Sequence, residues 1–189
     1  MAVYRRLNSA DISLYRDHLL RLDEDSRYAR FSGFLSDASI ASHCAGLDGR
    51  DTMILGYFSE GQLRGASEIR YEARLFPSSA ELAFSVERPF QGSRVGTGLM
   101  KRALVLLRNR GVRQAQVVCL LTNHRMQKLA LKFRSDARAS RGEVFLTVTV
   151  PPLDAASLMS EWQEGYLGWL ASGLDFAGGW IPESSPARP

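Results

Sequence analysis

Apolar residues at helical intervals predict two helices early in the chain. The first keeps its apolar residues on one side, and Asn8 or Ser9 can cap it. Those apolar residues are Ile12, Tyr15, Leu19 and Leu22. A charged stretch, residues 23–30, separates this helix from a second one expected at about residues 36–47.

Alternation with a period of two predicts a sheet. A short extended segment, residues 3–7, precedes the first helix. Residues 52–59 are apolar on both alternating faces, as in a strand that is covered on both sides. Glu60-Gly61 gives a tight turn into residues 62–71, so these two strands should form an antiparallel hairpin. Residues 80–86 resume the pattern as a third strand.

A helix between two strands predicts a parallel strand pair. Residues 97–110 form an amphipathic helix that stops at Gly111, and residues 114–121 are again rich in strand-forming residues. Together with residues 80–86 they make a βαβ unit, which requires parallel strands and a right-handed crossover.

The remainder of the chain is expected to close the sheet and end in a helix. Asn123 can cap a further helix, residues 134–142 are polar and predict a loop, and residues 143–150 predict a strand. Residues 151–171 contain a last helix whose apolar side either covers the sheet or forms a homodimer interface. Residues 172–189 are expected to form a flexible tail.

Composition narrows the class of protein. With 189 residues and 45% hydrophobic content, one domain over residues 1–150 is expected. The net charge of +4 suits an anionic ligand, but the basic residues are spread along the chain, which argues against nucleic acid. No apolar run is long enough for a membrane span and no secretory leader is visible, so a cytoplasmic location is expected. Cys44 and Cys119 have no metal-ligand spacing, so both should be reduced thiols and no metal is expected.

The stretch F-Q-G-S-R-V-G-T-G-L-M, residues 90–100, follows a strand and leads into a helix. Small residues let the backbone approach a ligand closely, and the N–H groups of the first helical turn point at any anion bound there. The helix dipole adds about 0.3 to 1 kcal/mol. This layout predicts a phosphorylated cofactor.

Residues 1–150 resemble the GNAT superfamily of acyl-CoA-dependent N-acetyltransferases. A-E-L-A-F-S-V at residues 80–86 and the glycine-rich stretch after it are similar to the family's strand and pyrophosphate loop, Q/R-x-x-G-x-G/A. Gln91 and Gly96 fall on the first and last positions of that motif. Arg94 stands where the family most often has its first glycine, and it either brings a guanidinium to the phosphates or points to solvent.

Two further segments carry the resemblance. N-H-R-M-Q-K-L-A-L-K-F at residues 123–133 is similar to the family's N-x-x-M-x-x-L segment, which contacts the pantetheine arm. R-Y-A-R-F at residues 27–31 looks like the region that shapes the acceptor side. The implied fold is α/β (α+β): a twisted, mixed but mostly antiparallel central sheet with one parallel strand pair, flanked by helices.

The resemblance also implies acetyl-CoA as co-substrate and a primary amine as acceptor: a protein lysine, a protein N-terminus or a small amine. The residues expected to contact the cofactor are Phe84, Ser85, Val86, Gln91, Gly92, Ser93, Arg94, Val95, Gly96, Thr97, Gly98 and Asn123. A backbone N–H around Ser85 or Val86 is expected to stabilise the oxyanion where the parallel strands splay apart.

Attack by an amine requires its free base. For a lysine-like amine with a pKa near 10.4, deprotonation at pH 7 costs about 4.6 kcal/mol, so a carboxylate or a water chain must accept the proton. Glu81 is the candidate base, because it faces away from the apolar residues of its strand; alternatively it pairs with an arginine. Glu68, close to Arg70, is the rival.

The sequence does not identify a general acid for the leaving thiolate, and it gives no catalytic role to the histidines. Many relatives protonate the leaving thiolate with a tyrosine in the helix after the asparagine, but none occurs between Asn123 and Phe133. His18, His43 and His124 are expected to be structural or on the surface, and their spacing builds no Ser/His/Asp arrangement. The sequence therefore predicts an acetyl-CoA-dependent N-acetyltransferase with Glu81 or water as base. The alternative is a catalytically weak acyl-CoA-binding sensor or interaction module.

Overall fold

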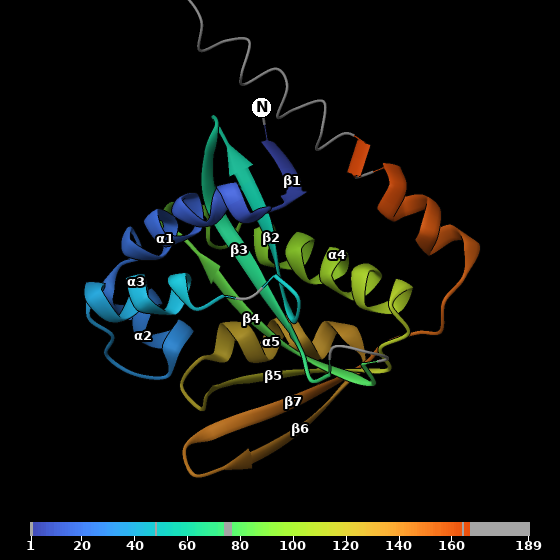
Figure 1. The fold of residues 1–189 in the computed structure, drawn as a ribbon. Helices are drawn as coiled ribbons and strands as arrows, with labels where there is room; N and C mark the ends of the chain where they lie inside the picture. Colours follow the sequence, from blue (N-terminus) through green and yellow to red (C-terminus); the bar gives the residue numbers. More distant parts are fainter. Residues whose placement is uncertain (1, 48, 74–76, 164, 167–189) are drawn as a thin grey trace, which may run out of the picture.

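One mixed sheet organises the chain. The computed structural model describes residues 2–47, 49–73, 77–163 and 165–166. Seven strands pair in the order β1-β2-β3-β4-β5-β7-β6 (Figure 1). They are β1 (Ala2–Arg6), β2 (Thr52–Ser59), β3 (Gln62–Tyr71), β4 (Ser79–Val86), β5 (Gln114–Leu120), β6 (Ser135–Ser140) and β7 (Glu143–Thr149). Only β4 and β5 run parallel, which confirms the predicted fold class and the βαβ unit.

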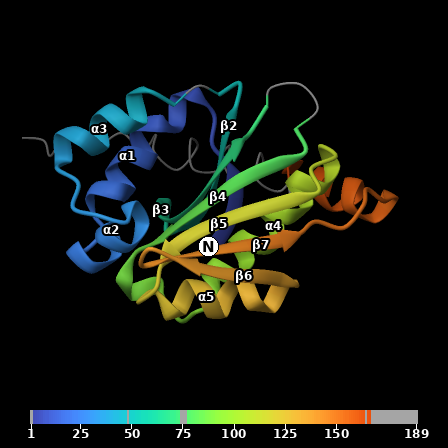
Figure 2. The same cartoon turned by 90° about the horizontal axis from the view of Figure 1, so that it is seen from below.

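Helices cover both faces of the sheet (Figures 1 and 2). One face carries α1 (Ile12–Leu20), α2 (Glu24–Phe31) and α3 (Asp37–Ala45). The other carries α4 (Val95–Asn109) and α5 (His124–Ala130). Short 3-10 turns lie at Ser9–Asp11, Arg88–Phe90 and Leu131–Phe133. None of the helices in the described ranges is long and apolar enough to cross a membrane.

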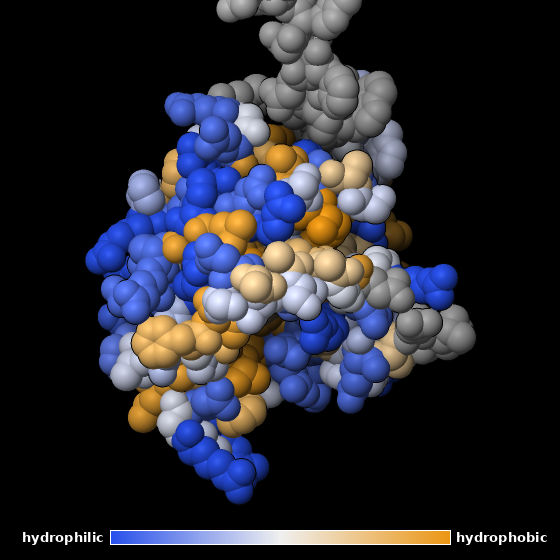
Figure 3. Space-filling view, turned by 60° about the vertical axis from the view of Figure 1, so that its left-hand side comes forward, coloured by the Kyte–Doolittle hydropathy of each residue, from blue (hydrophilic) through white to orange (hydrophobic). Residues whose placement is uncertain are grey.

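The apolar core is divided by the sheet. Tyr15, Leu19 and Ile40 pack from α1 and α3 onto one face. Met100 and Leu107 of α4 belong to a larger cluster on the other face, together with residues of β4, β5, β7 and α5. Seen from the side of α1–α3, the surface is mostly polar and is interrupted by apolar patches (Figure 3). The two-sided burial explains why β2 is apolar at successive positions.

One prediction about secondary structure is corrected, and one helix was not predicted. Residues 134–142, expected to be a loop, contain β6, an edge strand that pairs with β7. Its side chains are almost all exposed, so the sequence shows no apolar alternation. The strand is held by backbone pairing and by the turn at Arg141 and Gly142, which both have positive φ.

The charged stretch 23–30 forms most of α2, whose inward residues include arginines rather than an apolar stripe. Asp23 caps it by accepting from the Ser26 N–H.

The last helix is partly described. Residues 155–163, 165 and 166 are helical. Asn109 and Arg110, at the end of α4, contact Ser157 and Glu161 at 3.0 and 3.1 Å. Its large side chains do not cover the sheet in the described part, because Leu158, Trp162 and Tyr166 are 50%, 66% and 53% exposed. Trp169 and the expected tail, residues 172–189, lie outside the described residues.

A buried carboxylate joins the three helices of one face to the sheet. Glu68 of β3 accepts hydrogen bonds from Tyr15 of α1 (2.8 Å), Arg30 of α2 (2.7 Å) and His43 of α3 (2.9 Å). Arg70 adds a longer contact of 3.3 Å. Burial alone would raise the pKa of Glu68, but the hydrogen bond from His43 and the charge of Arg30 outweigh it and hold the pKa at about 2.

Glu68→Gln tests this anchor. The change leaves the buried Arg30 guanidinium without its counter-charge, so the free energy of unfolding at neutral pH should fall by about 3 to 5 kcal/mol in urea denaturation. Because the folded pKa of about 2 lies below the ordinary value of 4.5, the contribution of Glu68 is present above pH 4.5 and is lost as the pH falls toward 2. The variant should lack that part of the acid dependence.

The matched control is Glu81→Gln, an exposed carboxylate on the neighbouring strand, which should change stability by no more than about 0.5 kcal/mol. An equal loss of stability in both variants would contradict the role of Glu68 as the anchor.

Candidate active site

The parallel strands part soon after they meet. β4 and β5 pair only at Ser79–Gln114, Ala80–Ala115 and Glu81–Gln116. Beyond these pairs the two strands diverge (Figure 1), and the unpaired stretch between their carboxyl halves is the β4–β5 opening. Such an opening in a parallel pair leaves main-chain donors and acceptors free for a ligand.

The direction of those groups follows from strand alternation. The N–H of Glu87, just after β4, bonds to the Arg64 carbonyl at 3.0 Å on the β3 side. Successive residues of a strand point to opposite neighbours, so the main-chain groups of Phe84 and Val86 face the opening and those of Ser85 face β3. Of the two N–H groups expected to stabilise an oxyanion, Val86 therefore has the suitable direction and Ser85 does not.

The start of α4 forms a cradle for an anion. The helix begins at Val95, two residues earlier than the sequence predicted, and no side chain caps its N-terminus. The first intrahelical bond joins the Gly98 N–H to the Arg94 carbonyl at 2.9 Å, so the N–H groups of Val95, Gly96 and Thr97 point out of the helix end. The cradle thus has oriented donors and the positive end of the helix dipole.

Backbone conformation explains two residues of the loop. Gly92 has φ +80° and Arg94 has φ +67°, both in the left-handed region. Arg94 therefore adopts the conformation that favours glycine, which is the residue expected at this position of the motif. Ser93 closes the loop by donating from Oγ to the Phe90 carbonyl at 2.6 Å. Gly98 has a packing reason to lack a side chain, because a Cβ there would collide with the Tyr4 ring.

The side chain of Gln91 braces the opening. Its Nε2 donates to the Val86 carbonyl and to Ser26 Oγ of α2, both at 2.9 Å. Its Oε1 accepts from Arg125 of α5. Gln91 thereby joins the end of β4, the helical face and the start of α5.

Asn123 caps α5 by accepting the Met126 N–H at 3.1 Å, as predicted. That bond occupies its side-chain oxygen, and the helix carries no tyrosine.

A pocket of about 370 Å³ lies beside residues 27–31, the segment expected on the acceptor side. Its lining consists of Leu22, Glu24, Arg27, Tyr28, Gly33, Phe34 and Leu35.

Glu81 lies at the point where the strands part. It is exposed, and it interacts electrostatically with a residue of α2. Its cross-strand neighbour Arg70 contacts Glu68 instead, while the charge of Glu81 acts through space on the buried Arg30 of that helix. Glu68 is a poor base by comparison, since a pKa of about 2 makes its carboxylate a weak proton acceptor and its oxygens already accept four hydrogen bonds.

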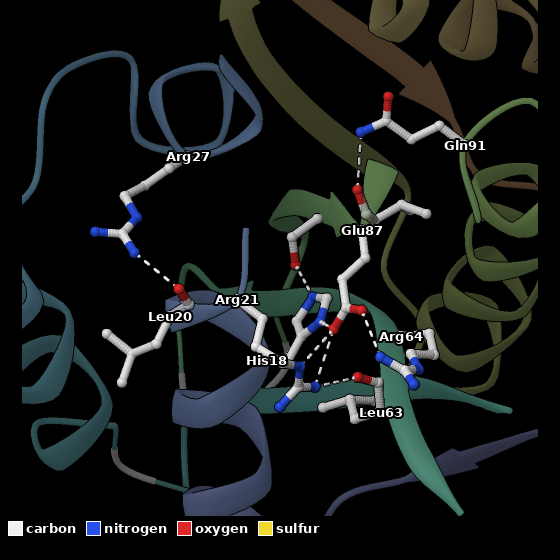
Figure 4. A network of polar contacts seen from close by, with 10 residues as sticks. His18, Leu20, Arg21, Arg27, Leu63, Arg64, Glu87 and Gln91 are labelled. Atoms are coloured by element: carbon white, nitrogen blue, oxygen red, sulfur yellow. Dashed lines mark hydrogen bonds and ion pairs between the residues drawn. The ribbon is translucent and has the colours of Figure 1, made fainter. Parts of the chain in front are cut away.

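A second buried polar cluster, which the sequence did not predict, lies at the end of β4 (Figure 4). His18 Nδ1 is 3.2 Å from Glu87 Oε1, and His18 Nε2 is 2.9 Å from Ser85 Oγ. Arg21 Nε and Arg64 Nη1 donate to the Glu87 carboxylate at 3.0 and 2.9 Å. Sequence spacing did not indicate this contact of a serine, a histidine and a glutamate, and the buried position of His18 agrees with the structural role expected for it. One signal was available, because His18 lies three residues after Tyr15 on the apolar side of α1.

Burial and neighbouring charges set the ionisation of His18 and Glu87. Burial lowers the pKa of His18 despite the nearby Glu87. Burial tends to raise the pKa of Glu87, but the hydrogen bonds from His18 and Arg64 and the charge of Arg21 hold it at about 2. His18 is neutral and Glu87 is ionised near neutral pH.

The other candidate groups have ordinary roles. His43 is bound to Glu68, and His124 is an exposed first residue of α5. Cys44 and Cys119 are both buried and free. Within the described ranges, no three histidine, cysteine, aspartate or glutamate side chains are grouped to hold a metal ion.

Several solved structures of acetyltransferases are similar to this chain. The GNAT domain of PAT from S. lividans is 21% identical, with a TM-score of 0.67 over 77% of this chain and 89% of that one. The ribosomal-protein-S18-alanine N-acetyltransferase from Escherichia coli is 13% identical, with a TM-score of 0.63 over 82% and 97% of the two chains. The PaiA N-acetyltransferase from Thermoplasma acidophilum, solved in complex with coenzyme A, is 16% identical, with a TM-score of 0.59 over 79% and 99%.

These TM-scores show a shared fold. A search of the curated proteins finds no match to the chain. The model of the acetyltransferase (GNAT) family matches residues 10–134, which is well over half of the 189 residues. The chain therefore belongs to the acetyltransferase (GNAT) family.

Proposed function

We propose that this protein is an acetyl-CoA-dependent N-acetyltransferase that moves the acetyl group to a primary amine, with Glu81 or water accepting the proton. The observation that carries the proposal is the opening between β4 and β5, which leads directly to the uncapped N-terminus of α4. The relative from Thermoplasma acidophilum that shares this fold was solved with coenzyme A, which supports a CoA thioester as the ligand.

The residues of the opening fit the parts of such a cofactor. Its pyrophosphate would accept hydrogen bonds from the N–H groups of Val95, Gly96 and Thr97. The pantetheine arm carries amide groups, which match the main-chain groups of Phe84 and the N–H of Val86 along the edge of β4, while the Val86 carbonyl accepts from Gln91. Asn123 begins the helix that follows β5 and so lies at the other side of the opening.

The chemistry follows from the same placement. The amine nitrogen bonds to the thioester carbon, the carbon–sulfur bond breaks, and the thiolate leaves. A main-chain N–H of β4 stabilises the charge on the carbonyl oxygen. Glu81 takes the proton of the amine directly or through water, since its carboxylate is exposed and accepts no hydrogen bond from a described residue. A thiolate with an ordinary pKa near 8.5 can leave without a tyrosine to protonate it.

Glu81→Gln should separate chemistry from binding. We expect kcat to fall by about 100-fold or more, because general base catalysis contributes a factor on the order of 100 to 10,000. The Kd for acetyl-CoA, measured by calorimetry, should stay within about twofold. Glu60→Gln, an exposed glutamate in the β2–β3 turn, is the control and should leave both values unchanged.

An unchanged kcat for Glu81→Gln would transfer the role of base to water. Binding of acetyl-CoA without turnover on lysine peptides, N-terminal peptides or small amines would instead favour the acyl-CoA sensor. Failure to bind either acetyl-CoA or CoA would contradict the proposed function as a whole.

Arg94→Gly tests whether the guanidinium contributes to the phosphate site. Glycine suits the left-handed conformation of this position, so the fold should keep its stability. Loss of one charge-assisted hydrogen bond at an exposed site should weaken acetyl-CoA binding by about three- to tenfold, and less at high salt.

Arg134→Gly is the matched control, because Arg134 is also exposed and left-handed, with φ +49°, and lies at the far end of β7 from the opening. Equal Kd values for the two variants and the unmodified chain would show that Arg94 points to solvent.

A further inference from the structure

The carboxyl half of β4 has a neighbouring strand on one side only. Residues 82–86 pair with β3, whereas pairing with β5 ends at Glu81. A strand with an open edge lacks half of the ladder hydrogen bonds that hold a central strand in place. The direction of the Val86 N–H, which faces the opening, therefore depends also on contacts from another layer of the structure. α1 supplies them (Figure 4).

One imidazole of α1 contacts the residues on both sides of Val86. His18 Nε2 is 2.9 Å from Ser85 Oγ, and His18 Nδ1 is 3.2 Å from Glu87 Oε1. All three side chains are buried, with exposures of 0% for His18 and 6% for each of the other two. Because water does not reach these groups, a hydrogen bond lost here has no replacement.

The charges around Glu87 give each of these bonds a single direction. Glu87 is held as an anion by Arg21 and Arg64 at 2.9 Å each, so its oxygens only accept. His18 Nδ1–H therefore donates to Glu87, which leaves Nε2 as an acceptor for the Ser85 hydroxyl. The side chains before and after Val86 are thus both held in place by the same ring.

We propose that His18 is a positioning residue for acyl transfer: by holding the residue on either side of Val86, it keeps the Val86 N–H directed at the thioester oxygen. The inference rests on the proposed function, because it needs an acyl-CoA in the β4–β5 opening. His18 is fully buried and does not touch the reactants, so the bonds that form and break remain those of direct attack by the amine.

Positioning and a purely structural role have different consequences. Loss of packing would lower the melting temperature and weaken cofactor binding and turnover together. Loss of position would leave the anion cradle intact, because its donors are the N–H groups at the start of α4, which these side chains do not contact. Acetyl-CoA would still bind, but its carbonyl would be less polarised.

Infrared difference spectroscopy of bound acetyl-CoA measures that polarisation directly. The full chain is saturated with acetyl-CoA that carries an isotope label at the thioester carbonyl, with no amine present, and Kd is measured by calorimetry. We expect the carbonyl stretching frequency to be higher in Ser85→Ala than in the unmodified chain, with Kd within about twofold, because a hydrogen bond to the carbonyl is weakened. If the unmodified chain bound no acetyl-CoA, the proposed function would have failed, rather than this inference.

Three further variants make the result specific. Ser85→Thr keeps the hydroxyl and should restore the frequency of the unmodified chain. His18→Phe keeps an aromatic ring but removes both hydrogen bonds, so it should raise the frequency as Ser85→Ala does. Ser67→Ala is the matched control, because Ser67 is fully buried on β3 and its hydroxyl has no hydrogen-bond partner among the described residues. It should change neither the frequency nor Kd.

Turnover gives a second readout with an amine that the unmodified chain acetylates. Ser85→Ala should lower kcat by about tenfold and leave KM for acetyl-CoA within about twofold, and Ser85→Thr should recover kcat. The expected loss is smaller than the effect of about 100- to 1,000-fold for removing an oxyanion donor, because the N–H is misdirected rather than removed.

An unchanged carbonyl frequency in Ser85→Ala and His18→Phe, both folded by circular dichroism and saturated with acetyl-CoA, would overturn the inference. So would an equal loss of binding and turnover in these variants, because it would assign the buried hydrogen bonds to stability alone.

Discussion

Parallel pairing between β4 and β5 stops after three residue pairs, and the features of the candidate site depend on that early end. If the ladder continued, the main-chain groups of Phe84 and Val86 would be consumed by β5. Because it ends, the edge of β4 stays available, Glu81 stands at the point of divergence, and the cradle of α4 lies at the far end of the same edge. A long, thin ligand with an anionic end matches this succession of groups.

Buried charge holds the opening in place. Glu68 joins α1, α2 and α3 to β3, and Glu87 joins α1 to the end of β4 through His18, Arg21 and Arg64. Both carboxylates have a pKa of about 2 because several donors outweigh their desolvation. Gln91 completes the frame by joining β4 to α2 and α5. Such pairs add little net stability compared with apolar packing, but they fix directions that apolar side chains leave free.

The sequence predicted those parts of the fold that have an apolar period. The hairpin of β2 and β3, the βαβ unit and the anion cradle belong to this class. It missed β6, whose S-D-A-R-A-S stretch pairs through the backbone at an exposed edge, and α2, whose inward Arg30 meets a partner 38 positions away. The partners of His18 lie 67 and 69 positions away, so no spacing rule could assemble that cluster. The left-handed Arg94 shows the converse, since its conformation is predictable from the glycine usual there and its contacts are not.

Hydrogen exchange with and without acetyl-CoA tests the central claim, that the ligand occupies the β4–β5 opening and ends at α4. The account predicts slower exchange of the amides of Phe84, Val86, Val95, Gly96 and Thr97 when acetyl-CoA is bound. Amides of α3, which packs with α1 on the other face of the sheet from α4, should not change. Binding that leaves the exchange of residues 84–97 unchanged, or protects another surface instead, would contradict it.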